Sequence, residues 1–335
     1  MSQDFGTSPL ISPKRSHIQP SPKKGKVLVL AGPTATGKTK IGIEVAKKLS
    51  GEIISADSMQ VYLGMDIGTA KASLEERLEI PHHLIDICEI ADPFNVAKFH
   101  TEATRLIEGI IARDQVPIVV GGTGFYIHAL LYGPPQGPPS DEKTRMELEE
   151  ELGEKGVEEL YERLKSLDPE YAKTITPQDR VKIVRALEII KLSDEKVSKF
   201  KITLPSQAIS PFDFHCWFLH YPREILYPRI EMRCDEMIAK GFVKEVEALL
   251  RRGLRENRSA ALSIGYRQCI EFLESDRTSQ EFEKFIWSFK QASRRYAKRQ
   301  FTWFRKEPLF HWLDLSEQGE EAAIDLIVEE FISSI

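Results

Sequence analysis

The chain contains a complete phosphate-binding loop. It follows the pattern Gly-x-x-x-x-Gly-Lys-Thr and consists of Gly32, Pro33, Thr34, Ala35, Thr36, Gly37, Lys38 and Thr39. An apolar run at 27–30 predicts a strand directly before the loop, and a helix is expected after it. Backbone N–H groups of such a loop converge on an anion at the positive end of the helix. Lys38 adds a positive charge and Thr39 a hydroxyl ligand for Mg²⁺, so the sequence predicts a site for a di- or triphosphate.

Hydrophobic residues make up 41% of the 335-residue sequence, enough for the core of one large or two ordinary domains. No apolar run approaches the ~18 residues of a membrane span, and no secretory signal is visible. We therefore expect a cytoplasmic protein that does not contact a membrane. Residues 1–24, which contain little to bury, are predicted to form a disordered tail. The cysteines lack a Cys-x-x-Cys pair, which favours buried thiols over a zinc site or a disulfide framework.

Positive charge is concentrated near the C-terminus, although the formal net charge is -5. No Asp or Glu occurs between Trp287 and Arg305, a stretch that contains Lys290, Arg294, Arg295, Lys298, Arg299 and Arg305. On a helix these basic residues share one stripe, and Phe289, Tyr296 and Trp303 recur every seven positions on a second stripe that we expect to pack. A solvated surface helix would usually mix both charge signs. The stretch therefore favours a polyanionic partner.

Strand-like and helical segments alternate over the first 130 residues, as in a parallel sheet covered on both faces. Strands are predicted at 52–56, 83–87 and 116–120, with a helix at 96–112. Asp57 follows the first of these strands and Thr123 follows the last. Both residues are thus expected at the carboxyl edge of the sheet, where open α/β folds bind ligands. The predicted fold class is an α/β P-loop NTPase-like sheet flanked by helices, with a small all-helical insertion domain.

A Pro-rich segment at 134–139 marks a boundary in the chain. We predict a catalytic core that begins at 25–135, a helical insertion domain at 136–208, and a return to the core at 209–335 through a strand at 214–221. Two apolar faces are predicted within the insertion, formed by Leu160, Leu164 and Leu167 and by Ile183, Leu187 and Ile190. Trp217 and Trp312 are expected in the core, and His82 and His83 are expected to be structural.

Five separated segments closely resemble the tRNA dimethylallyltransferases, also called tRNA isopentenyltransferases. Beyond the phosphate-binding loop, they are Asp57-Ser58-Met59-Gln60 continuing to Lys71, Pro81 to Asp86, Gly121 to Tyr126, Gly265-Tyr266-Arg267-Gln268, and Tyr296 to Arg305. The likeness extends from Lys26 to Leu313 and is to bacterial-type members without a zinc finger. Lys182 stands where the family generally has Arg, and Ala72 replaces a common Pro.

The resemblance implies transfer of a dimethylallyl group from dimethylallyl diphosphate to N6 of the adenosine just 3′ of the tRNA anticodon. The phosphate-binding loop, Mg²⁺ on Thr39 and the matched Arg233 would then stabilise the departing diphosphate. Asp57 would accept the N6 proton, and Thr123 would contact the leaving oxygen or the amine. Alternatives remain open at this stage. Asp57 could instead reach Mg²⁺ through water, Thr123 could cap the next helix, and Asp66 and Lys71 could pair with each other.

The partner implied by the resemblance is the anticodon stem-loop of tRNA, whose target base must leave its stack to reach the sheet. The residues expected to contact the tRNA are Ser58, Met59, Gln60, Arg145, Lys182, Arg185, Gly265, Tyr266, Arg267, Lys298, Arg299, Gln300, Trp303 and Arg305. We expect the chain to act as a monomer.

Two other enzyme classes remain compatible with the phosphate-binding loop by itself. They are a small-molecule kinase and an adenylate isopentenyltransferase, and the helical insertion and basic C-terminal stretch argue against the latter. A GTPase-like switch is disfavoured because the guanine signature Asn-Lys-x-Asp is missing from the sequence. Transfer of label from dimethylallyl diphosphate to tRNA, rather than from a γ-phosphate, separates the transferase from a kinase.

Overall fold

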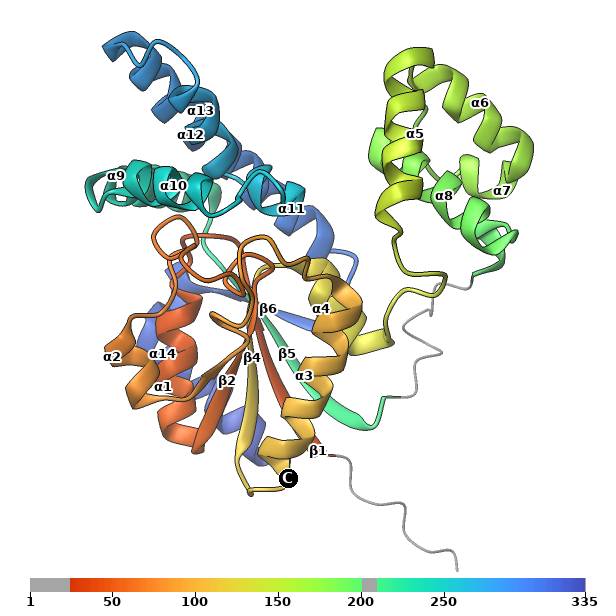
Figure 1. The fold of residues 1–335 in the computed structure, drawn as a ribbon. Coiled ribbons are helices and arrows are strands. Elements are labelled where there is room, and N and C mark those ends of the chain that lie inside the picture. Colours follow the sequence, from red (N-terminus) through yellow and green to blue (C-terminus); the bar gives the residue numbers. More distant parts are fainter. Residues whose placement is uncertain (1–24, 201–209, 335) are drawn as a thin grey trace, which may run out of the picture.

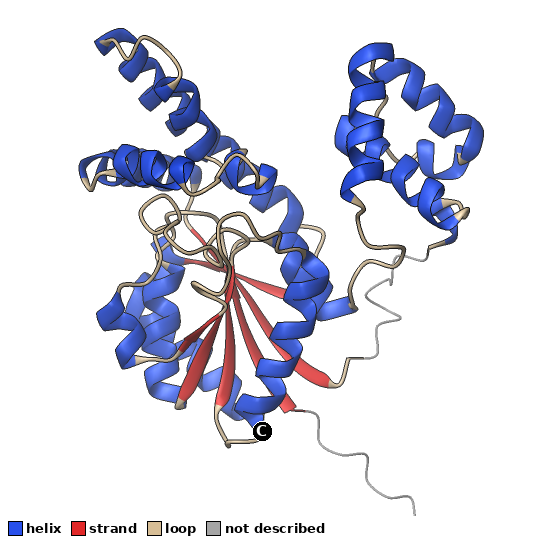
Figure 2. Ribbon diagram, in the orientation of Figure 1, coloured by secondary structure: helices blue, strands red, loops and turns tan. Residues whose placement is uncertain are grey.

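A six-stranded parallel sheet forms the centre of the protein in the computed structural model, which describes residues 25–200 and 210–334 (Figure 2). The strands are β1 (Gly25–Ala31), β2 (Gly51–Ala56), β3 (His82–His83), β4 (Val116–Gly121), β5 (Phe212–His220) and β6 (Phe310–Asp314). Their order across the sheet is β3-β2-β4-β1-β5-β6. The predicted α/β fold class is confirmed. The predicted tail at 1–24 lies outside the described residues.

Helices cover both faces of the sheet because the strands are apolar on both faces. In β1, Leu28 and Leu30 join one buried cluster, whereas Val27 and Val29 join the other. The first cluster includes side chains of α1 (Lys38–Leu49) and α14 (Leu315–Ser333), and the second includes those of α3 (Val96–Ile111) and α4 (Gly124–Tyr132) (Figure 1). This sandwich fixes the carboxyl ends of β1, β2 and β4 at one edge.

The third predicted strand is much shorter than expected, since it ends at His83. Leu84 and Asp86 have φ values of 60° and 55°, in the left-handed region, so the segment leaves the sheet directly. The turn brings the Asp86 carboxylate to Lys71, 2.5 Å from its Nζ. Of the two preceding histidines, His83 makes a structural contact, since its Nε2 lies 2.6 Å from a carboxylate oxygen of Glu52, and His82 Nδ1 lies 2.7 Å from Ile80 O.

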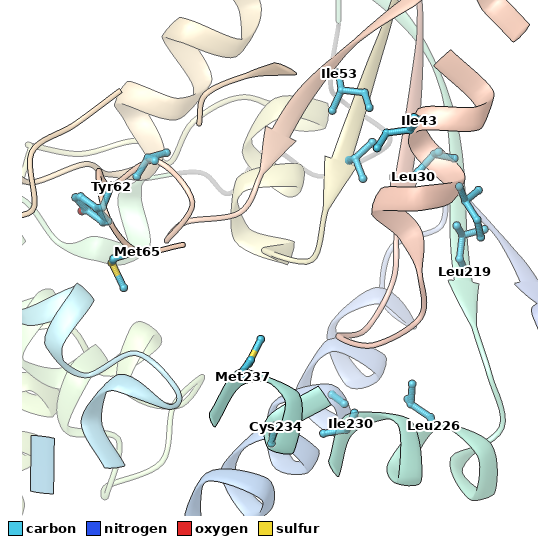
Figure 3. Packing of buried hydrophobic residues seen from close by; sticks show 14 of the residues in the cluster. Leu30, Ile43, Ile53, Tyr62, Met65, Leu219, Leu226, Ile230, Cys234 and Met237 are labelled. Carbon is cyan, nitrogen blue, oxygen red and sulfur yellow. The ribbon is translucent and has the colours of Figure 1, made fainter. Parts of the chain in front are cut away.

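A layer of helices lies over the carboxyl edge of the sheet (Figure 1). It comprises α9 (Arg223–Ala239), α10 (Phe242–Arg251), α11 (Arg258–Ala261), α12 (Tyr266–Leu273) and the long α13 (Ser279–Phe304), while the short α2 (Leu74–Glu79) lies near α1. Figure 3 shows part of the buried cluster to which α9 contributes Leu226, Ile230, Cys234 and Met237. The same cluster continues to the sheet, so the helical layer and the sheet share one core.

The packed face of α13 differs from the predicted stripe. Phe289 is buried, but Trp303 is 39% exposed. The buried positions instead recur every three or four residues: Phe285, Phe289, Ser293, Ala297, Gln300 and Phe304. Phe285 and Trp303 are separated by about five helical turns and lie on the same side of an α-helix, so which of them is buried depends on what packs against each end of α13 and not on the spacing. Trp312 also departs from the prediction, because it is 37% exposed on the edge strand β6, whereas Trp217 is buried as expected.

Residues 142–199, which follow α4 in the chain, form a helical bundle that lies apart from the sheet (Figure 1). It contains α5 (Glu142–Lys155), α6 (Val157–Leu167), α7 (Pro169–Ala172), α8 (Arg180–Ser193) and the 3₁₀ turn η1 (Val197–Lys199). Its own apolar cluster includes Leu148, Leu160, Leu164, Ile183 and Leu187. Leu167 is exposed, contrary to the prediction. Across all described residues, every helix is too short or too polar to span a membrane.

Candidate functional site

The phosphate-binding loop turns sharply between β1 and α1. Gly37 immediately precedes α1 with φ 85°, a left-handed conformation in which glycine has little strain. A Cβ on Gly32 would lie 2.5 Å from the carbonyl oxygen of Leu219, so this position also needs glycine. No side chain caps the N-terminus of α1. Its first N–H groups are therefore available to an anion, as the motif predicts.

Buried and partly buried polar side chains hold this loop from outside. Gln300 of α13 accepts a hydrogen bond from Thr34 N (3.1 Å) and donates one to Gly122 O (2.9 Å). Arg229 of α9 donates to Ala35 O (3.0 Å). The sequence predicted an RNA contact for Gln300, but its amide is buried and already joins the two loops that follow β1 and β4. This bridging role was not foreseen.

Two cations face the loop with few carboxylates near them. Lys38 Nζ donates to Pro33 O (3.1 Å), and Arg233 Nη1 donates to Thr34 Oγ1 (3.0 Å). Burial, together with the charge of Arg233, lowers the pKa of Lys38 to about 8, against an opposing effect of Asp57. Burial likewise lowers the pKa of Arg233. Two desolvated positive charges side by side favour a multivalent anion between them.

Asp57 follows β2 and lines a cavity of about 900 Å³ together with Lys38, Thr39 and Arg233. Its Oδ1 accepts a hydrogen bond from Met59 N (2.9 Å), which sets the direction of the side chain. The predicted neighbours Ser58, Met59 and Gln60 line the same cavity. The tertiary structure thus brings the predicted base, the phosphate-binding loop and the matched arginine to one space.

Thr123 stands at the N-terminus of α4 but does not cap it with its side chain. The capping alternative is therefore wrong. Its Oγ1 accepts a hydrogen bond from Ser58 N (3.1 Å) and donates one to Ser58 Oγ (3.5 Å). Tyr296 lines the cavity, and burial beside Asp57 raises its pKa. Sequence reasoning missed Tyr296 as a site residue because the seven-residue spacing assigned it to packing.

One carboxylate from α10 fixes the loop that continues from Asp57 to Lys71. Glu245 accepts hydrogen bonds from three successive backbone N–H groups, those of Asp66 (2.9 Å), Ile67 (2.6 Å) and Gly68 (3.1 Å). It accepts a fourth from the Tyr266 hydroxyl (2.7 Å). These four donors use the acceptor capacity of both oxygens. No motif in the sequence pointed to Glu245.

The Gly265-Tyr266 pair has an interior position rather than the exposed one that an RNA contact needs. Tyr266 is 1% exposed, and a Cβ on Gly265 would lie 2.7 Å from the ring of Phe289. A Cβ on Gly68 would lie 2.4 Å from the ring of Phe242. Close packing of Gly68 against Phe242 therefore joins the 57–71 loop to the helical layer, whereas Gly265 packs within that layer. Arg267, in contrast, is exposed.

Lys71 and Asp66 form the ion pair that was considered from the sequence, at 2.7 Å. Lys71 Nζ also donates to Tyr62 O (2.7 Å) and to Asp86. Because its side chain is almost entirely buried, these three acceptors supply the hydrogen bonds that water would otherwise provide. Lys71 therefore closes the far end of the same loop.

The three predicted RNA contacts of the insertion take part in intramolecular ion pairs. Arg145 and Arg185 both bind the buried carboxylate of Glu188, at 3.1 and 2.9 Å, and Lys182 pairs with Asp179 at 3.0 Å. Arg145 and Arg185 thus help to hold α5 and α8 together. Within the described ranges, the exposed Lys298, Arg299 and Arg305 of the α13 region pair with no carboxylate.

We expect Glu245→Gln to lower kcat/KM for the reaction at this site about 10- to 100-fold, because a glutamine amide points a donor at N–H groups that need an acceptor. The amides of 66–68 should lose protection in hydrogen exchange. Glu247→Gln, which changes a carboxylate of the same helix that faces Arg277 at 3.5 Å, should leave both measurements near wild type. Equal effects of the two variants would contradict this role for Glu245.

Comparisons with known proteins agree with the motifs. The IPP transferase family model matches residues 60–307, and the Isopentenyl transferase model matches 25–93. The tRNA dimethylallyltransferase of Protochlamydia amoebophila is 54% identical over 308 residues, which are 92% of this chain and 89% of that protein. The enzyme of the same name from Chlamydia pneumoniae is 45% identical over 309 residues, 92% of this chain and 90% of its own length.

Solved structures show the same similarity. A tRNA delta(2)-isopentenylpyrophosphate transferase from Staphylococcus epidermidis superimposes with a TM-score of 0.67 at 37% identity, over 92% of this chain and all of that one. A eukaryotic dimethylallyltransferase described as acting on tRNA gives a TM-score of 0.74 at 30% identity, over 92% of this chain and 80% of that one. With family models and relatives that cover most of its length, this chain belongs to the IPP transferase family, whose matched members are named tRNA dimethylallyltransferases.

Proposed function

We propose that this protein transfers a dimethylallyl group from dimethylallyl diphosphate to N6 of the adenosine just 3′ of the tRNA anticodon and releases diphosphate. One observation carries the proposal: a single cavity is lined by the phosphate-binding loop, the partly buried cations Lys38 and Arg233, and the carboxylate of Asp57. A diphosphate and a proton-donating nucleophile can meet there. We propose that the protein acts as a monomer.

The loop and its cations would stabilise the leaving group. As the allylic carbon–oxygen bond breaks, its electron pair passes to the diphosphate, and negative charge increases beside Lys38, Arg233 and the N-terminus of α1. Fixed donors aimed at developing charge lower the barrier, and removal of one typically costs about 10²- to 10³-fold in rate. Arg233 is held against Thr34 of the loop, so it approaches the diphosphate from the α9 side.

Asp57 would accept the proton. The N6 amine forms its new bond to the allylic carbon, and the N6 proton passes to the carboxylate of Asp57. Thr123 would bind the bridging oxygen or the amine. The hydrogen bond from Ser58 N to its Oγ1 supports this role, because Ser58 directly follows Asp57 in the chain. Residues 57–60 and 66–71 of the loop fixed by Glu245 line the same cavity.

The donor set fits Mg²⁺. Thr39 and Asp57 line the same cavity, and Mg²⁺ usually binds one or two protein oxygens together with substrate phosphates and water. Among the described residues, no group of three His, Cys, Asp or Glu side chains could hold a metal by itself. A metal that arrives bound to a diphosphate does not need such a group. When bound, the ion would neutralise charge on the diphosphate.

The tRNA would enter over the helical layer. We propose that Lys298, Arg299 and Arg305, which pair with no carboxylate among the described residues, bind its backbone. We also propose that the insertion domain at 136–208 contacts the stem through the helices α5 to α8. Flipping the target base out of its stack costs a few kcal/mol, which such contacts must offset. The exposed Arg267 and the cavity residues Ser58, Met59 and Gln60 are proposed to lie near the flipped nucleotide.

Mass spectrometry of tRNA nucleosides tests the proposal. Unmodified tRNA incubated with the protein, dimethylallyl diphosphate and Mg²⁺ should yield N6-dimethylallyladenosine at the nucleoside 3′ of the anticodon. AMP offered as the acceptor should yield no product, and γ-labelled ATP should transfer no label. Product from AMP alone would instead assign the adenylate isopentenyltransferase activity, and transfer of γ-label would assign a kinase.

A further inference from the structure

Two exposed aromatic rings form a corner beside the cavity. Phe125 of α4 is 45% exposed and Trp303 of α13 is 39% exposed. Their ring centroids are 6.3 Å apart, and the ring planes meet at 73°. A flat molecule that stacks on one of these rings can therefore touch the other with its edge.

The position of Trp303 is fixed by its neighbours. A Cβ on Gly124 would lie 2.4 Å from the Trp303 ring, so only a glycine allows the indole to approach the start of α4 so closely. The His128 ring meets the indole edge-to-face, with centroids 6.2 Å apart. His128 is itself held by the buried carboxylate of Glu307, at 2.8 Å. The indole is thus braced in place before any partner binds.

The corner adjoins both the cavity and the unpaired positive charge. Phe125 is three residues beyond Gly122 and Trp303 is three residues beyond Gln300, and both Gly122 and Gln300 line the cavity. Arg299 lies one helical turn before Trp303 and lines the cavity. Single exposed aromatic residues are common on protein surfaces. The two rings of this corner, however, lie near cations that pair with no carboxylate among the described residues, and this combination suits a negatively charged ligand that can stack.

We propose that the Phe125–Trp303 corner stacks an unpaired base of the RNA loop that neighbours the base in the cavity. This inference rests on the proposed function and adds the contact that would keep the loop open while the target base is extruded. The rings recognise the flat face of a base, which every base has, so the contact contributes affinity with little sequence preference. The cations beside the corner neutralise the adjoining phosphates.

The test measures binding of the full-length protein to an anticodon stem-loop RNA with 2-aminopurine next to the target adenosine. The variants are Trp303→Leu, Phe125→Leu and Trp303→Phe, which restores a ring. We expect Trp303→Leu to weaken binding about 10- to 100-fold, as loss of one base–aromatic stack does. The fluorescence quenching of 2-aminopurine on binding should decrease in both Leu variants and recover in Trp303→Phe.

Two controls separate stacking from other effects. Trp287→Leu removes a 60% exposed tryptophan from the same helix and should leave affinity and quenching unchanged. Lys298→Ala should reduce the slope of log affinity against log salt by about 1, whereas Trp303→Leu should not alter it. Diphosphate affinity, measured alongside, should be the same in all variants if their folds are intact.

Wild-type affinity and quenching in Trp303→Leu and Phe125→Leu would overturn the stacking role while leaving the proposed function in place. Equal losses in Trp287→Leu would also overturn it, since the effect would then belong to α13 as a whole. Failure of the unmodified protein to bind the RNA at all would reject the proposed function together with the inference. If a protein partner binds in a way that depends on Trp303 and RNA does not, the Phe125–Trp303 corner is a protein-binding surface and the stacking role is rejected.

Discussion

Replacing Asp57 with asparagine is expected to lower kcat for dimethylallyl transfer about 10²- to 10⁴-fold, the usual contribution of a positioned general base. Asparagine keeps the size of the side chain and its acceptor oxygen for Met59 N, so the local turn should persist. Because the variant loses only the group that takes the N6 proton, its Kd for tRNA should stay near the wild-type value. Single-turnover transfer assays and RNA-binding titrations measure the two quantities.

Asp66→Asn is the matched control, since Asp66 also lines the cavity but is paired with Lys71 at 2.7 Å. Its effect on kcat should be several-fold at most. A magnesium titration separates the two roles left open for Asp57. If the carboxylate mainly holds the ion, excess Mg²⁺ restores much of the activity of Asp57→Asn, and if it is the base, excess Mg²⁺ restores none. Near-normal kcat in Asp57→Asn would remove the residue from the chemistry.

Lys38→Met should lower kcat/KM for dimethylallyl diphosphate about 10²- to 10³-fold, because it deletes a partly buried charge proposed to face the leaving group. Methionine has a similar length and can fill the space of the lysine stem, which limits any effect on folding. Lys40→Met provides the control from the same helix: Lys40 is exposed and pairs with Glu320 at 2.9 Å, so its loss should change kcat/KM little. Steady-state kinetics with varied diphosphate substrate measure both variants.

The lowered pKa of Lys38 predicts the pH dependence of diphosphate binding. In the free protein the group is charged below a pKa of about 8 and becomes neutral above it. A bound diphosphate favours the charged form and raises this pKa, so affinity should fall up to about tenfold per pH unit above pH 8. Calorimetry should detect proton uptake on binding in the same window. Lys38→Met should lose the part of the pH dependence that Lys38 causes, whereas the part caused by titration of the substrate should remain. The same pH profile in wild type and Lys38→Met would contradict the role of Lys38.

The fold and the chemical centre were predictable because they depend on local patterns. Buried parallel strands are continuous apolar runs, and the ends of the runs at Ala56 and Gly121 mark where polar residues emerge. Since parallel strands share one carboxyl edge, Asp57, Thr123 and the phosphate-binding loop had to approach one another. The third strand was overpredicted because left-handed φ values at Leu84 and Asp86 leave no signal in an apolar run.

The role of individual polar groups was much less predictable. Arg145 and Arg185 resemble RNA contacts in the sequence, yet both bind the buried Glu188. Lys290 and Arg294 belong to the basic stretch but pair with acidic residues of α9, whereas Lys298 and Arg299 do not. Which cations remain free depends on acids that lie some 40 to 60 positions away, as the pairs Arg145–Glu188 and Arg294–Glu231 illustrate.

By itself, then, the sequence determined the anion-binding turn, the parallel sheet and the carboxylate at its edge, because each follows from the spacing of glycines and apolar residues along a few turns of chain. Only the tertiary structure decided that Gln300 connects the loops that follow β1 and β4, that Glu245 holds the 57–71 loop, and that Trp303 is partly exposed. These outcomes depend on how α10 and α13 pack over the sheet. A hydrogen bond between distant segments forms only when this packing places both partners. The periodicity of residues within one segment therefore does not predict the distant partner.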